Sequence, residues 1–91
     1  MIKFAFYEKT KSLSSCQIRA YLISNNWIES GALGKKATIW HRPENDDSEI
    51  ILPEDTHLRD YSARIMDVLV VLSEYENRFV EDIFADISMY V

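Results

Sequence analysis

An apolar pattern with helical spacing constrains the fold more than any other feature of the chain. Six apolar residues follow one another at intervals of three and four positions: Leu58, Tyr61, Ile65, Val68, Leu72 and Tyr75. Neither glycine nor proline interrupts residues 57–76. Because residues three and four positions apart share one face of a helix, the pattern predicts a long amphipathic helix over 57–76. Asp55 or Thr56 can cap its start, and Asn77 can end it.

Turn residues divide the chain before this helix into short elements. A capping box of Ser14 and Gln17 predicts a first helix over residues 15–25, ended by two asparagines. Both glycines of the chain then fall within residues 31–36 and predict a hairpin loop between two strands. Residues 37–42 and 49–52 favour strands, separated by a turn over 43–47 and stopped by a proline. These strands predict a three-stranded antiparallel meander.

The two ends of the chain add one element each. Residues 2–6 alternate between apolar and other side chains, which predicts an edge strand within residues 1–7 that can pair with a second copy. Apolar residues at helical spacing predict a last helix within residues 78–91. The order β-α-β-β-β-α-α over a single domain, 1–91, predicts an α+β fold with helices packed on the meander, and residues 15–77 as its central part. We expect a core of Trp27, Ile39, Ile51, Leu58, Ile65 and Leu72.

Composition excludes several classes of protein. The longest apolar run, residues 68–72, is far shorter than the roughly 18 residues that a membrane-crossing helix needs. A single cysteine, Cys16, forms neither an internal disulfide nor a zinc cage. No export signal is recognised, so we expect a cytoplasmic protein. We also expect that it carries no cofactor and no metal.

Charge is divided unevenly along the chain. Residues 1–43 carry a net charge of +5, and residues 44–91 carry −10. We expect an acidic surface to bind a protein partner, as small acidic immunity and inhibitor proteins do, through Glu44, Asp46, Asp47, Glu54 and Asp55. Because signatures of catalysis are missing, the favoured function is a small non-catalytic protein-binding regulator of the antitoxin, immunity or anti-defence type.

Residues 18–72 also carry the features of a known family. The first helix ends at Asn26 and Trp27, a glycine-bearing hairpin follows, and Pro43 and Pro53 bracket the last strand before the long helix. In this order the chain resembles the HicA family of small toxins that cleave messenger RNA. The resemblance implies an α-β-β-β-α core like that of the double-stranded-RNA-binding domain.

The catalytic position of that family differs in this chain. Where the family has a histidine, this sequence has Gly34, Lys35 and Lys36, and Asn26 replaces the glycine before the tryptophan. The resemblance therefore implies RNA binding without cleavage as the alternative function, with four phosphate contacts: Arg19, Lys35, Lys36 and Arg42. A simpler interpretation pairs these bases with surface carboxylates: Glu74, Glu76 or Asp67.

Two smaller groups of residues carry potential chemistry. His41 and His57 flank several carboxylates (Asp46, Asp47, Glu49 and Asp55), which suggests a metal site or an acid-base pair, although the histidines stand sixteen positions apart. Cys16 follows three serines (Ser12, Ser14 and Ser15) at a helix start, where the helix dipole lowers a thiol pKa or binds phosphate. Capping and solvation explain both groups more simply, so we expect no catalytic residue.

Overall fold

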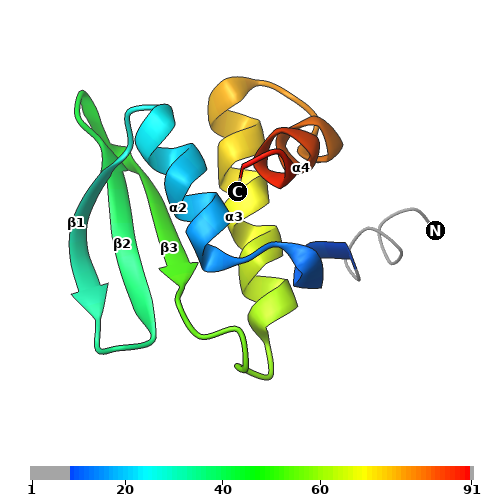
Figure 1. The fold of residues 1–91 in the computed structure, drawn as a ribbon. Coiled ribbons are helices and arrows are strands. Elements are labelled where there is room, and N and C mark those ends of the chain that lie inside the picture. Colours follow the sequence, from blue (N-terminus) through cyan, green and yellow to red (C-terminus); the bar gives the residue numbers. More distant parts are fainter. Residues whose placement is uncertain (1–8, 91) are drawn as a thin grey trace.

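The chain folds into a three-stranded antiparallel sheet with helices packed against it (Figure 1). A computed structural model describes residues 9–90, apart from the side chains of residues 45–47. Its elements are the 3-10 helix η1 (Thr10–Ser12), helix α2 (Ser15–Ser24), strands β1 (Ile28–Leu33), β2 (Ala37–Arg42) and β3 (Asn45–Pro53), and helices α3 (Tyr61–Glu76) and α4 (Val80–Ser88). The predicted α+β fold is confirmed. The predicted strand over residues 2–6 lies outside the described residues.

Helix α2 begins and ends where the sequence predicts. The Ser14 side chain accepts a hydrogen bond from the Gln17 backbone N–H, and the Gln17 side chain accepts one from the Ser14 backbone N–H. This reciprocal capping box satisfies two backbone donors that the first helical turn leaves unpaired. At the other end Asn26 adopts a positive φ of 69°, a left-handed conformation that asparagine tolerates better than most residues.

The sheet has the strand order β1-β2-β3, with both neighbouring pairs antiparallel. Its first turn is shorter than predicted, because residues 31–33 belong to β1 and only residues 34–36 form the loop. Gly34 supplies the positive φ of 60° that this tight turn requires. The second turn occupies residues 43–44, so β3 begins at Asn45 rather than at Glu49.

Helix α3 begins four residues later than the sequence predicts. The carboxylate of Asp55 accepts a hydrogen bond from the His57 backbone N–H, and the backbone N–H of Leu58 donates to the Asp55 carbonyl. Asp55 thus stabilises a local turn, a common alternative role for aspartate side chains, and the helix starts at Tyr61. Its predicted end is confirmed, because Asn77 has a φ of 56° and closes the helix in the left-handed conformation.

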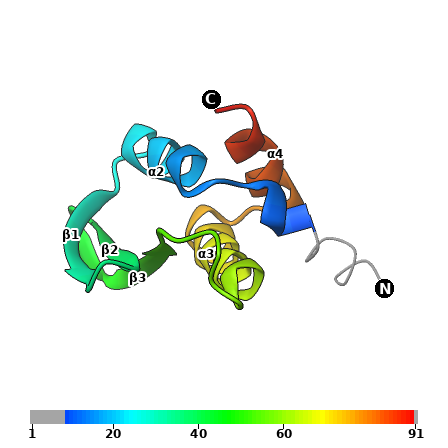
Figure 2. The same cartoon turned by 60° about the horizontal axis from the view of Figure 1, so that its bottom comes forward.

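Figure 2 shows the sheet beside helices α2 and α3. One hydrophobic core joins these elements with α4. The strands contribute Trp40, Ile50 and Leu52, and the helices contribute Ile18, Leu22, Ile65, Leu69, Leu72, Ile83 and Ile87. Trp27, Ile65 and Leu72 are core residues as predicted, whereas Leu58 packs at the margin. The prediction was wrong for Ile39 and Ile51, which lie on the opposite face of the sheet. Successive side chains of a strand alternate between faces, so burial of Trp40 and Ile50 turns their neighbours outward.

Candidate functional site

The face of the sheet turned away from the core is rich in apolar side chains, and we call it the open face. Opposite residues in the three strands share a face, so the register defines it row by row. One row joins Leu33, Ala37 and Pro53, and the next joins Gly31, Ile39 and Ile51. Leu33 is 52% exposed and Ile51 is 40% exposed. Exposed large aliphatic side chains grouped on one face are typical of interaction surfaces.

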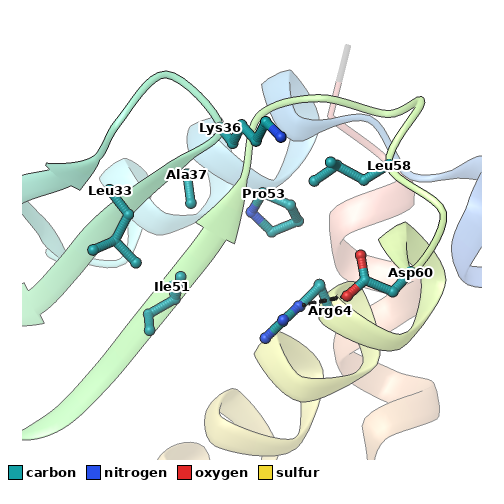
Figure 3. A pocket seen from close by; sticks show the side chains of 8 residues that line it. All are labelled: Leu33, Lys36, Ala37, Ile51, Pro53, Leu58, Asp60 and Arg64. Atoms are coloured by element: carbon teal, nitrogen blue, oxygen red, sulfur yellow. Dashed lines mark hydrogen bonds and ion pairs between the residues drawn. The ribbon is translucent and has the colours of Figure 1, made fainter.

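A hollow of about 280 Å³ lies at one end of the open face, where the sheet meets the segment before α3 (Figure 3). Its apolar lining consists of Leu33, Ala37, Ile51, Pro53 and Leu58. Charged side chains stand at its margin: Lys36, Asp60 and Arg64. Arg64 Nε donates to Asp60 Oδ2 at 3.0 Å, whereas the Lys36 ammonium forms no ion pair with any described side chain. The hollow suits an apolar side chain that has a carboxylate beside it.

Polar side chains from all three strands meet at the other end of the open face. Ser30 Oγ lies 2.6 Å from His41 Nδ1, and His41 Nε2 lies 3.2 Å from Glu49 Oε2. The Ser30 hydroxyl has one proton and also lies 3.3 Å from the Ile39 carbonyl, so it donates either to that carbonyl or to His41 Nδ1. Ser30 occupies the irregular step of the β1–β2 ladder, between Glu29 and Gly31. This β-bulge aims the serine at the histidine and fixes the orientation of its ring.

Arg19 of the predicted phosphate-binding group pairs with two carboxylates. Its guanidinium lies 2.8 Å from Glu29 on β1 and 2.7 Å from Glu54 after β3, and it covers the ring of Trp40. Glu54 also accepts a hydrogen bond from the Thr38 hydroxyl. The hydrogen bond to Glu29 is the main reason that the pKa of Arg19 is raised. Arg19 therefore joins α2 to two strands of the sheet.

Arg42, the second arginine of that group, is held between aromatic rings. Its guanidinium lies 5.7 Å from the ring centre of Trp27 and 4.8 Å from that of Tyr75, which is a cation–π arrangement. It also donates to Glu44 at 3.1 Å and to the Asn25 carbonyl. The Tyr75 hydroxyl donates to the same Glu44 carboxylate, and this bond, more than the arginine, lowers the pKa of Glu44. The predicted pairing of these bases with Glu74, Glu76 or Asp67 was wrong.

The remaining bases lie together at the hairpin. Lys35 and Lys36 are exposed in the turn between β1 and β2, and neither ammonium forms an ion pair with a described side chain. Of the four predicted phosphate contacts, two thus pair with carboxylates and two have no ion pair within the described part of the chain.

The predicted acidic group is divided by the length of β3. Glu44 precedes this strand, whereas Glu54 and Asp55 follow it. Nine residues of extended chain span roughly 30 Å, so the two sets lie at opposite ends of the sheet. Glu54 forms an ion pair with Arg19, and the Asp55 carboxylate accepts a hydrogen bond from the backbone of its own turn. Asp46 and Asp47 belong to β3, but their side chains lie outside the described residues.

The two histidines lie apart, each beside its own carboxylate. His41 contacts Glu49, while the exposed His57 lies 3.5 Å from Asp55. Among the described side chains, no three from His, Cys, Asp and Glu come together as a metal would require. Cys16 is an exposed free thiol in the first turn of α2. The serine before this helix, Ser14, acts as the predicted cap.

Sequence reasoning overlooked the open face and its hollow. Side chains alternate in β2, so Thr38, Trp40 and Arg42 share one face of the strand and the residues between them share the other. Assigning Trp40 to the core would have turned Ile39 outward, and the register then places Ile51 beside it. No comparable signal in the sequence predicts that Ser30 contacts His41, because the position of Ser30 depends on the bulge.

No protein-family model, curated protein or solved structure matches the chain. The HicA resemblance therefore stays a prediction from the sequence. None of the helices within residues 9–90 has the length and apolar character to cross a bilayer.

Proposed function

We propose that the chain is a non-catalytic protein-binding regulator whose partner docks on the open face of the sheet. The observation that carries this proposal is the group of exposed aliphatic side chains beside an apolar hollow. Interfaces gain most of their binding energy from a few apolar anchors that enter well-packed pockets. Leu33 and Ile51 flank such a pocket, and a Leu or Phe side chain of the partner fits its chemistry.

Charges at the two ends of the open face give the partner an orientation. Lys36 and Arg64 stand at the hollow, while Glu49, in the middle of β3, lies opposite His41 near the end of β2. A partner segment with an acidic residue next to its apolar anchor and a basic residue at its other end is complementary to this pattern. Complementary charges of this kind mainly set the association rate and the choice of partner.

The acidic surface enters this proposal through the start of β3. Glu44, Glu54 and Asp55 have partners within the fold, so we assign the acidic contribution to Asp46 and Asp47. Replacing both aspartates with lysine is expected to slow capture of a basic partner and to leave the fold intact. Small size and net acidity agree with a regulator of the antitoxin, immunity or anti-defence type.

Two matched variants test the open face as the docking surface. Ile51→Glu places a carboxylate on that face, and Val70→Glu places one on α3, where the valine has nearly the same exposure, 38% against 40%. A tagged wild-type chain is used to capture its partner from the native host, and the affinity of the purified pair is measured. Ile51→Glu is expected to abolish capture while Val70→Glu retains it. Equal binding by both variants contradicts the proposed surface.

The same capture experiment distinguishes the RNA-binding alternative. Lys35 and Lys36 are the predicted phosphate contacts that have no internal ion pair among the described residues. If RNA rather than protein is recovered, and the double change Lys35→Ala and Lys36→Ala lowers the salt dependence of binding, the alternative replaces our proposal. Each lost phosphate contact lowers the slope of log affinity against log salt by roughly 0.7–0.9.

A further inference from the structure

We propose that strand β1 pairs with β1 of a second copy, antiparallel and about a two-fold axis, to form one six-stranded sheet. This inference does not depend on the proposed docking of a partner on the open face. It rests on the backbone groups of β1 and on the side chains of Ile28 and Leu33, of which Leu33 also borders the hollow of the partner surface.

Strand β1 is the accessible edge of the sheet. It lies at one end of the strand order, and all six of its residues are exposed. The other edge strand, β3, lies against α3 (Figure 1). Figures 1 and 2 both place β1 at the end of the molecule away from α4. Backbone N–H and C=O groups along such an edge are open to pairing with a further strand.

The sequence of β1 lacks the residues that usually block edge pairing. Protective edges carry proline or charged side chains, lysine above all. Strand β1 contains neither lysine nor proline, and its one charged residue, Glu29, lies 2.8 Å from Arg19 on its own chain. Two copies of β1 therefore meet without unpaired like charges. The bulge occupies the half near Glu29, and residues 31–33 continue in regular pairing with β2.

Exposed apolar side chains identify a second copy as the occupant of this edge. Ile28 and Leu33 stand at the two ends of β1, and they are 51% and 52% exposed. Antiparallel pairing brings Ile28 of each chain toward Leu33 of the other. In each of the two resulting contacts, the isoleucine and the leucine shield each other from water. Both residues lie on the open face, because Ile28 pairs with His41 and Leu33 with Ala37. A two-fold axis closes the assembly at a dimer and joins the two open faces.

The test combines a charged edge variant with a matched control. Ile28→Lys replaces one member of each Ile28–Leu33 pair with lysine, the residue that natural edge strands carry against pairing. Ser24→Lys adds the same charge at an exposed position on α2. Sedimentation across a concentration series is expected to give a dimer for the wild type and Ser24→Lys, and a monomer for Ile28→Lys at the same concentrations. Circular dichroism checks that each variant is folded.

Hydrogen exchange on the wild-type chain gives a readout that needs no substitution. Amides of β1 that do not bond to β2 are expected to exchange more slowly at high than at low protein concentration. A monomer at every concentration overturns the proposal, and so does a dimer that persists in Ile28→Lys. Deleting residues 1–8 supplies the last outcome: if the deletion abolishes the dimer, the predicted N-terminal strand makes the contact and the β1 pairing is rejected. Ile51→Glu is expected to leave the dimer intact, which separates this result from loss of the partner surface.

Discussion

Nη2 of Arg19 lies 2.7 Å from Oε2 of Glu54, and this ion pair joins two residues that the sequence assigned to opposite surfaces. Arg19 belongs to the basic half of the chain and Glu54 to the acidic half. The pair of Arg42 with Glu44 repeats the relationship at the other end of the sheet. Bases of the first half of the chain therefore pair with acids of the second half in the folded protein. This pairing favours the open face over a purely charged surface as the candidate interaction surface.

The Arg19 cluster is expected to stabilise the fold more than an ordinary surface pair. Arg19→Ala leaves Glu54 with Thr38 alone and removes the stacking on Trp40, which should lower the free energy of unfolding by roughly 1–2 kcal/mol. Arg64→Ala removes an exposed pair one helical turn apart and should cost about 0.5 kcal/mol or less. Urea unfolding of both variants makes the comparison. Equal losses would show that the bridge between α2 and the strands adds nothing.

Two adjacent residues of β3 are expected to respond very differently to truncation. Ile50 is 1% exposed in the core, so Ile50→Ala should lower the free energy of unfolding by about 2–4 kcal/mol. Ile51 lies on the open face, and Ile51→Ala should cost about 1 kcal/mol or less. Thermal or urea unfolding measures both. The assignment of the two faces is incorrect if Ile51→Ala proves the more damaging change.

Alkaline pH is expected to weaken the fold through Tyr61. Burial raises the pKa of this hydroxyl to about 12, and the hydroxyl donates to the Leu13 carbonyl at 2.8 Å. Because the folded chain holds this proton more tightly than the unfolded chain, the stability from Tyr61 is full below about pH 10 and is lost as the pH rises to about 12. Tyr61→Phe lacks that loss but forfeits the hydrogen bond, worth about 1 kcal/mol at neutral pH.

The difference between the wild type and Tyr61→Phe isolates this effect. Burial also raises the pKa of Tyr21, but that residue is present in both chains and cancels in the comparison. Free energies of unfolding measured at about pH 8 and about pH 11 should therefore show the wild-type advantage narrowing at the higher pH. An advantage that stays constant between the two would mean that Tyr61 has the same pKa in the folded and unfolded chains.

The capping box at α2 is expected to support the whole first helix. Ser14→Ala removes the acceptor of the Gln17 backbone N–H and should lower the free energy of unfolding by about 1 kcal/mol. Ser24→Ala, at the exposed end of the same helix, serves as the control and should change stability by less than about 0.5 kcal/mol. Denaturant unfolding distinguishes them, and indistinguishable midpoints would deny the box any stabilising role.

Local signals in the sequence explain which parts of the fold were predictable. Ser14 and Gln17 start α2, Asn77 ends α3, and the apolar spacing of the long helix survives in Ile65, Val68 and Leu72. Each of these features depends on residues within one or two helical turns of one another. Boundaries were less certain where a side chain had two local roles, as when Asp55 capped a turn rather than a helix.

The sequence by itself therefore determined the three α-helices, the three strands and their order within residues 9–90, since capping, turn residues and periodicity act over a few neighbouring positions. Tertiary structure alone decided which face of the sheet is buried, because alternation defines two faces without indicating which one meets the helices. It also decided that Arg19 reaches Glu54, thirty-five positions away, and that Ser30 meets His41 through a bulge. Such contacts depend on how elements pack together, and the period of a strand (2 residues) or of a helix (3.6 residues) does not predict that packing.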